Sequence, residues 1–200
     1  MIVMTIDQRR SRRDIDRVDD LLGQLAQAEV VRPFERTAGD EVQGVLADAA
    51  TVVDLAVRVA TDGHWSIGIG IGAVETPLPR TTRAGRGEAF ELARDAVEAA
   101  KGEPIPVAVR GAAIPVVAHA QTALRLLVDL CQSRSPAGAE AVAAMQSPMT
   151  QSEAAAFLGV SPQAISQRLR TARWELERPA RELAVDLLAQ ADELGGVSTR

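Results

Sequence analysis

The sequence predicts an α+β domain, built on a sheet that includes antiparallel strands, followed by an all-helical module. Three observations support this prediction. Up to about residue 110, short apolar runs typical of strands alternate with segments of helical periodicity. Every periodic segment after residue 115 is helical, and the run Ser-Arg-Ser-Pro-Ala-Gly at 133–138 breaks the chain between the two parts. We therefore expect one domain over 1–133 and a second over 138–195. The last helix is expected at 179–194, where it could support dimerisation, and 195–200 are expected to be frayed.

The first domain is predicted to alternate strands and helices along the chain. Residues 1–6 form an apolar run expected in a central strand, and Gly39-Asp40 between two strand-like runs signals a tight hairpin. In 65–74 isoleucine alternates with glycine, so we expect another backbone, a helix or a ligand to lie close to the glycine face. Strands are expected at 1–6, 33–37, 41–46, 65–74 and 105–110, and helices at 14–31, 47–60, 87–101 and 115–132.

The composition limits the functions open to the chain. Apolar residues make up 46% of it, enough for a substantial core. The aromatic share is only 2% and tyrosine is lacking, which disfavours modules that bind RNA or single strands by base stacking. The net charge is −5 at pH 7, so the surface is not basic throughout. Any contact with nucleic acid would have to come from a local basic face.

Cysteine content and hydropathy bear on where the protein is located. Cys131 is the single cysteine, so no intrachain disulfide can form and no cysteine-based metal site is indicated. The apolar start at 1–6 is short and is followed by charge, which does not fit a signal peptide. No apolar run approaches the roughly 20 residues of a membrane span. We expect a cytoplasmic protein with no membrane partner.

The stretch at 150–174 has the pattern of a helix-turn-helix. A short helix is expected at 151–158, Gly159 suits the turn, and a second helix is expected at 164–174. Ser161 is a good N-cap for that second helix, and Pro162 is a good first helical residue. The residues placed to form the core shared by the two helices are Leu158, Val160, Ile165 and Leu169.

The exposed side of the second helix is predicted to bind double-stranded DNA. Its candidate contacts to bases and phosphates are Ser161, Gln163, Ala164, Ser166, Gln167, Arg168 and Arg170. Arg168 stands where such motifs more often carry an apolar residue. Residues 150–182 hold five arginines and four glutamates, so the basic charge is modest and favours a homodimer on DNA. The alternatives are an ordinary helical hairpin with a solvated face and a module that docks onto another protein.

Two acidic residues suggest a second site in the first domain. Asp7 ends the first strand and Asp40 lies in the hairpin turn, so both carboxylates are expected at the same end of the sheet. A divalent cation such as Mg²⁺ would relieve their repulsion while binding a phosphate. Nearby arginines, including Arg9, Arg12 and Arg83, are positioned to meet the phosphates of a nucleotide. The simpler alternatives are that Asp7 pairs with a neighbouring arginine and that Gly39-Asp40 is only a turn.

Over about residues 1–110 the chain resembles the SatD family and, more remotely, the catalytic domains of nucleotidyl cyclases and GGDEF proteins. The resemblance is carried by Asp7 after the first strand, the turn Gly39-Asp40-Glu41, and the glycines at 68, 70 and 72. It implies a palm-like sheet with a ferredoxin-like core and an active site near a dimer interface. It also implies metal-binding roles for Asp7 and Asp40, and nucleotide contacts near Gly39.

The chain departs from the cyclase pattern where catalysis would need it most. Glu91 and Asp95 align with the Asn and Arg that stabilise the transition state in cyclases, and acids there would repel a triphosphate. We therefore expect no enzymatic activity. The predicted function is a DNA-binding transcriptional regulator, with a degenerate cyclase-like domain that senses a nucleotide, with or without Mg²⁺. The alternative is a divergent metal-dependent nucleotidyl transferase or nucleotide hydrolase that carries a helix-turn-helix.

Overall fold

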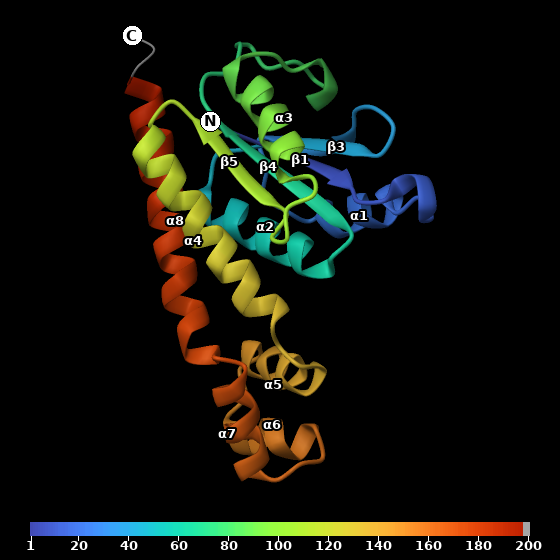
Figure 1. The fold of residues 1–200 in the computed structure, drawn as a ribbon, viewed down its shortest axis with the longest axis vertical. Helices are drawn as coiled ribbons and strands as arrows, with labels where there is room; N and C mark the ends of the chain where they lie inside the picture. The colour runs from blue at the N-terminus through green and yellow to red at the C-terminus, as the bar shows by residue number, and fades with distance from the viewer. Residues whose placement is uncertain (198–200) are drawn as a thin grey trace.

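The computed structural model describes residues 1–197 and shows a five-stranded mixed sheet with helices on both faces (Figure 1). The strands are β1 (Ile2–Gln8), β2 (Arg32–Arg36), β3 (Glu41–Leu46), β4 (Trp65–Ile71) and β5 (Val107–Gly111). They lie in the order β2-β3-β1-β4-β5, with β1 antiparallel to both neighbours and β4 parallel to β5. The predictions of an α+β sheet and of a central first strand are therefore confirmed.

The two faces of the sheet are covered by different helices. Ile2, Met4 and Ile6 of β1 point into the main core. The helices contributing to that core are α1 (Val18–Leu25), α2 (Ala49–Asp62), α4 (Ile114–Gln132) and, at the end of the chain, α8 (Trp174–Val197). The opposite face is covered by α3 (Glu88–Ala100), whose Phe90 and Ala93 pack with Val3.

The glycines of β4 let α3 lie directly on the sheet. A Cβ atom at Gly68 would be 2.2 Å from the backbone nitrogen of Val97, and one at Gly70 would be 2.2 Å from the carbonyl oxygen of Ala89. Any side chain at these positions would push the helix away. The alternating isoleucines fill the main core on the other face. Of the covers predicted for the glycine face (another backbone, a helix or a ligand), the structure shows a helix, α3.

The first helix is shorter than predicted. The expected helix at 14–31 is replaced by a 3₁₀ turn, η1 (Ser11–Arg13), a loop, and then α1. Aspartate side chains compete with helix formation here, because Asp14 accepts from the backbone N–H of Ile15 at 2.8 Å and Asp16 from that of Val18 at 3.0 Å.

The remaining helices form a second cluster and then return to the first. They are α5 (Pro136–Gln146), α6 (Gln151–Phe157), α7 (Pro162–Thr171) and α8 (Trp174–Val197). The cluster of α5 to α7 has its own core. Most of α8 lies along α4, and its Ala184, Leu188 and Ala191 belong to the main core (Figure 1). The closing helix, which we expected in the second domain, therefore completes the first core.

Helix boundaries near the end of the chain also differ from the prediction. The expected helix at 164–174 ends at Thr171, because the chain turns through Arg173, whose φ is 52°. The closing helix, expected at 179–194, begins at Trp174 and continues through Pro179 to Val197. The frayed end expected at 195–200 is thus helical as far as Val197, and 198–200 lie outside the described residues.

Within residues 1–197, one helix is long and apolar enough, by length and composition alone, to cross a membrane. It is α4, so the expectation that no apolar run approaches that length was wrong. The buried core helix of a globular domain passes the same test. In this structure Leu124, Leu127 and Val128 of α4 are fully buried against the sheet and its helices.

Candidate functional site

The turn between α6 and α7 is fixed by local hydrogen bonds. Thr150 and Glu153 form a reciprocal cap at the start of α6, with the Glu153 carboxylate 2.7 Å from the Thr150 backbone nitrogen. Gly159 has a φ of 64°, which favours glycine. The Ser161 hydroxyl accepts from the backbone N–H of Ala164 at 3.2 Å and caps α7. The predicted turn and cap are therefore confirmed.

One face of α7 is buried and holds it against α5 and α6. Ile165 and Leu169 are buried, and they pack with Ala141, Val142 and Ala155. The small Ala155 is 2% exposed, so a larger residue at this position would push the two helices apart. The packing fixes which side chains of α7 face outward.

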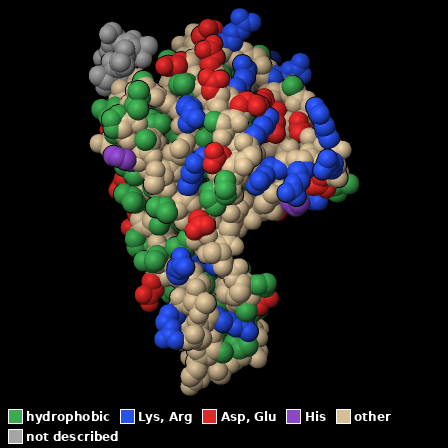
Figure 2. Space-filling view, in the orientation of Figure 1, with side chains coloured by type: hydrophobic (Ala, Val, Ile, Leu, Met, Phe, Trp, Pro, Cys, Tyr) green, Lys and Arg blue, Asp and Glu red, His purple; other side chains and the backbone are tan. Residues whose placement is uncertain are grey.

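The outward face of α7 carries polar and basic side chains and no acid. The predicted contact residues that are exposed are Ser161, Gln163, Ser166, Gln167 and Arg170, and Ala164 is half-buried. The Arg170 guanidinium contacts the Gln167 amide oxygen, which holds the two side chains together. Figure 2 shows basic side chains on the tip of the molecule that α5, α6 and α7 form.

Arg168 differs from the other predicted contact residues. Its side chain is 28% exposed, and its Nη1 atom lies 3.8 Å from the carboxylate of Glu140 on α5. Its face of α7 is turned partly towards α5. Arg173, which the sequence interpretation left out, is exposed directly after α7. No ion pair or side-chain hydrogen bond is formed by Arg173 among the described residues. The sequence offers no direct sign that Arg173 is a contact residue, because its exposure depends on where the chain bends between α7 and α8.

The second candidate site is a cavity of about 500 Å³ at the end of β1. As predicted, it brings Asp7, Asp40 and Arg12 together. The residues that complete its lining are Gln8, Arg10, Ser11, Arg13 and Lys101. Lys101, just beyond α3, was missed by the sequence interpretation. It reaches the cavity because α3 runs back along β4 towards the end of β1 at which Asp7 lies.

Lys101 is the ion-pair partner of Asp7. Its Nζ atom is 3.0 Å from Asp7 Oδ2 and 2.6 Å from Glu98 Oε1. Burial raises the pKa of Asp7, and this outweighs the lowering by Lys101, with Asp40 raising it further. Burial lowers the pKa of Lys101, but its bonds to Glu98 and Asp7 outweigh that effect and the net shift is upward. The ammonium group thus remains charged beside Asp7.

The donor set fits an anion better than a metal ion. Lys101 supplies the positive charge that Mg²⁺ would bring to Asp7. Among the described residues, no three His, Cys, Asp or Glu side chains gather in an arrangement that could hold a metal. A magnesium ion at Asp7 and Asp40 remains a prediction, and it would have to displace Lys101.

The loop after β1 holds four arginines whose charges are not neutralised by an acid. Arg10 has a φ of 57° and starts the η1 turn. In the described part of the chain, Arg17 and Arg36 pair with Asp14 and Asp16, whereas no ion pair involves the arginines at 9, 10, 12 and 13. The alternative that Asp7 pairs with Arg9 or Arg12 is therefore wrong. Arg9 lines a neighbouring cavity with His64 and Gly63.

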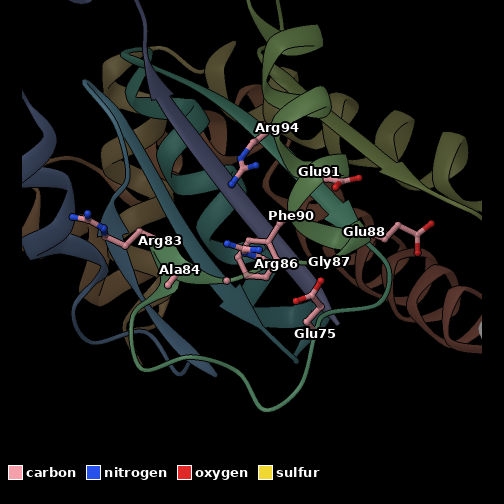
Figure 3. A pocket seen from close by; sticks show the side chains of 10 residues that line it. Glu75, Arg83, Ala84, Arg86, Gly87, Glu88, Phe90, Glu91 and Arg94 are labelled. Atoms are coloured by element: carbon pink, nitrogen blue, oxygen red, sulfur yellow. The ribbon is translucent and has the colours of Figure 1, made fainter.

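The remaining predicted nucleotide residues lie elsewhere. Gly39 has a φ of 57° in the hairpin turn, and its carbonyl accepts from Arg36 at 2.6 Å. Arg83 lines a separate cavity of about 650 Å³ at the start of α3. Figure 3 shows Arg86 and Arg94 converging over Phe90 in that cavity, while Arg83 points away from them. The predicted nucleotide residues therefore do not share one cavity, since Arg12 lines the Asp7 cavity, Arg9 a neighbouring one and Arg83 the cavity at the start of α3.

Glu91 and Asp95, which the resemblance aligns with the Asn and Arg of cyclases, are both exposed on α3. Glu91 lines the cavity of Figure 3 and points away from its centre, and Asp95 is one turn further along the helix. No model of a known protein family matches the chain, and no curated protein matches it either. Most of the predicted contact residues lie on the outward face of α7 or around the Asp7 cavity.

Proposed function

We propose that the protein is a dimeric, DNA-binding transcriptional regulator in which α6 and α7 form a helix-turn-helix. The observation that carries the proposal is the division of α7 into two faces. Ile165 and Leu169 anchor it in the helical core, while Gln163, Gln167 and Arg170 face solvent with no acid among them. A helix anchored in this way can enter the major groove of DNA.

The side chains of α7 fall into two groups, those suited to contact bases and those suited to contact phosphates. Gln163 and Gln167 lie one turn apart and can each form a pair of hydrogen bonds with adenine. Ser161, Ser166 and Arg170 would contact phosphates, and Ala164 would contact a thymine methyl group. Arg168 would leave Glu140 to reach the DNA. Arg173 adds a phosphate contact to the set predicted from the sequence.

The first domain would be a cyclase-like domain used for sensing. The order β2-β3-β1-β4, with α1 and α2 on one face, supports a palm-like, ferredoxin-like core. Exposed acids at Glu91 and Asp95 support a domain without catalysis. The Asp7 cavity, with Lys101 and the unpaired arginines, would bind the phosphates of a nucleotide effector.

A second candidate function rests on one observation, that Asp7 and Asp40 line the same cavity. Paired carboxylates next to arginines are the equipment of a metal-dependent nucleotidyl transferase or hydrolase. This function requires release of pyrophosphate or phosphate from a nucleoside triphosphate with Mg²⁺ or Mn²⁺. The release would have to disappear in Asp7→Ala and Asp40→Ala.

Selection of bound sequences from random DNA, followed by gel shift, tests the main proposal. The Gln167→Ala/Arg170→Ala variant should lose about 10-fold or more in affinity for the selected site. Arg178→Ala is the matched control, because Arg178 is 89% exposed on α8, outside the proposed contact face. Equal affinities of the two variants, or no selected sequence, would refute the proposal.

Salt separates DNA binding from docking onto another protein. Affinity for DNA should fall steeply as salt rises, because counterions are released from the phosphates. An apolar docking surface would show no such fall. If the first domain senses a nucleotide, a saturating nucleotide should change the affinity of the protein for the selected DNA site, and an unchanged affinity would refute this role.

A further inference from the structure

The long closing helix α8 exposes a row of leucines. Leu176 is 56% exposed, Leu183 54% and Leu194 47%, and Leu187 is half-buried. We call these four residues the leucine stripe. Figure 2 shows hydrophobic side chains gathered along the edge of the molecule that α4 and α8 form. Exposed leucines on one helix are costly in water and indicate a surface that is covered by a partner.

The stripe borders the side of α8 that builds the core, and its half-buried Leu187 also packs against that core. Successive residues of an α-helix are about 100° apart, so positions 176, 183, 187 and 194 fall on one side. Ala184, Leu188 and Ala191 lie on another side, which packs against α4. The exposed acids Glu182, Asp186 and Glu193 lie on a third side.

The spacing within the stripe is that of a coiled-coil seam. Ala180 and Gln190 occupy the intermediate positions, so the steps between neighbouring seam residues are alternately four and three. Ala180 and Leu187 are half-buried against the main core, whereas the other four positions are exposed and stay open to a partner helix. One further helix can pack there without disturbing the core.

The spacing is also symmetric about position 185, and this identifies the partner. When a second α8 is laid antiparallel, Leu176 falls opposite Leu194 of the partner subunit and Leu183 opposite the partner subunit's Leu187. Ala180 then falls opposite the partner's Gln190. A two-fold interface requires this reciprocity, since residue i meets j while j meets i. An unrelated partner helix requires no such symmetry.

We propose that two copies of the chain associate through antiparallel pairing of α8 along the leucine stripe. This deepens the dimeric regulator proposed above by naming the dimer surface. The two Trp174 residues would lie about 33 Å apart along the paired helices, at 1.5 Å per residue. That is close to the distance of about 34 Å between DNA half-sites one turn apart. Because α7 directly precedes Trp174, the two α7 helices would lie near the two ends of the paired α8 helices.

The first test is the mass of the protein in solution, measured by light scattering and sedimentation over a range of concentrations. Leu183→Glu/Leu187→Glu should weaken the dimer by about 100-fold or more, because four charges enter an apolar seam. Ile15→Glu is the matched control, since Ile15 is 68% exposed and lies outside α8. A monomer in the unmodified protein, or a dimer equally stable in both variants, would overturn the proposal.

The second test addresses the register, and it holds even where the double variant does not fold. A mixture of Leu176→Cys and Leu194→Cys proteins should form a mixed disulfide on mild oxidation, whereas each protein alone should not. Cys131 is buried, so it should not compete. Crosslinking of Leu176→Cys with itself would indicate a parallel pair and refute the register.

Salt distinguishes failure of this proposal from failure of DNA binding. Near the two-fold axis Asp186 approaches its own counterpart, so added salt should strengthen the dimer by screening the repulsion. DNA binding should weaken under the same change. A salt-strengthened dimer without DNA binding would support the interface and refute the regulator, and the converse result would refute the interface alone.

Discussion

Removal of the Glu177 carboxylate should destabilise the whole molecule. Glu177 in the first turn of α8 pairs with Arg134 at 2.7 Å and with Arg181 at 2.9 Å. The side chains of Arg134 and Glu177 are 7% and 9% exposed, so both charges are largely removed from water. The Nη2 atom of Arg134 forms an ion pair with Glu177 but no hydrogen bond, because the angles between the groups are unsuitable. The Nε atom of Arg134 donates a hydrogen bond to the carbonyl oxygen of Ala172, 3.1 Å away. Glu177→Ala would leave a buried guanidinium without its partner.

The expected loss is about 3–5 kcal/mol, the usual cost of leaving one charge of a buried pair uncompensated. With a denaturant slope near 3 kcal/mol per molar, this lowers the urea midpoint by about 1–2 M. The control is Glu182→Ala on the same helix, whose partner Arg178 is 89% exposed, and it should cost less than about 1 kcal/mol. Equal midpoints for the two variants would show that the buried cluster contributes nothing special.

The same cluster should make stability depend on acid. Burial raises the pKa of Glu177, but the two guanidinium groups outweigh it and hold the pKa below the ordinary 4.5. A lowered folded-state pKa means that this contribution is complete above about pH 4.5 and is lost as the pH falls through the folded value. Urea midpoints measured between pH 7 and pH 3 should therefore decline less in Glu177→Ala than in the unmodified protein.

Two other predictions concern the sheet and the cavity. Gly68→Ala should destabilise the protein by about 1–3 kcal/mol or more, because α3 must move off β4, whereas Gly23→Ala in α1, with open space around it, should stabilise by about 0.5–1 kcal/mol. Thermal and urea unfolding measure both, and an unchanged Gly68→Ala would contradict the close packing. Lys101→Met should weaken binding of pyrophosphate without Mg²⁺ by about 10-fold or more in calorimetry. Arg94→Met, in the other cavity, should not, and equal effects would place the anion elsewhere.

Features set by neighbours in the sequence were predictable. The hairpin follows from Gly39-Asp40, and the close approach of α3 follows from the glycines of β4. The cap at Ser161 and the turn at Gly159 are likewise local. In each case the residue type allows few backbone conformations, so a short pattern was sufficient.

Features that depend on distant partners were not predictable. Lys101 reaches Asp7 only because α3 runs antiparallel to β4 and therefore ends beside the last residues of β1. Arg168 turns towards Glu140, an acid on a different helix. The length of α1 was misjudged because the competing hydrogen bonds of Asp14 and Asp16 do not alter the apolar periodicity. A single sequence contains no signal for such long-range choices.

The path of the chain makes the cluster of α5 to α7 an insertion rather than an appendage. The chain leaves the sheet domain after α4 and re-enters it with α8, and the contact of Arg134 with the Ala172 carbonyl shows that exit and entry lie side by side. Truncation after residue 133 would therefore strip Ala184, Leu188 and Ala191 from the main core. Replacing 136–171 by a short turn would preserve that core. The sheet domain should therefore be isolated by deleting the cluster of α5 to α7 internally, and not by truncating the chain.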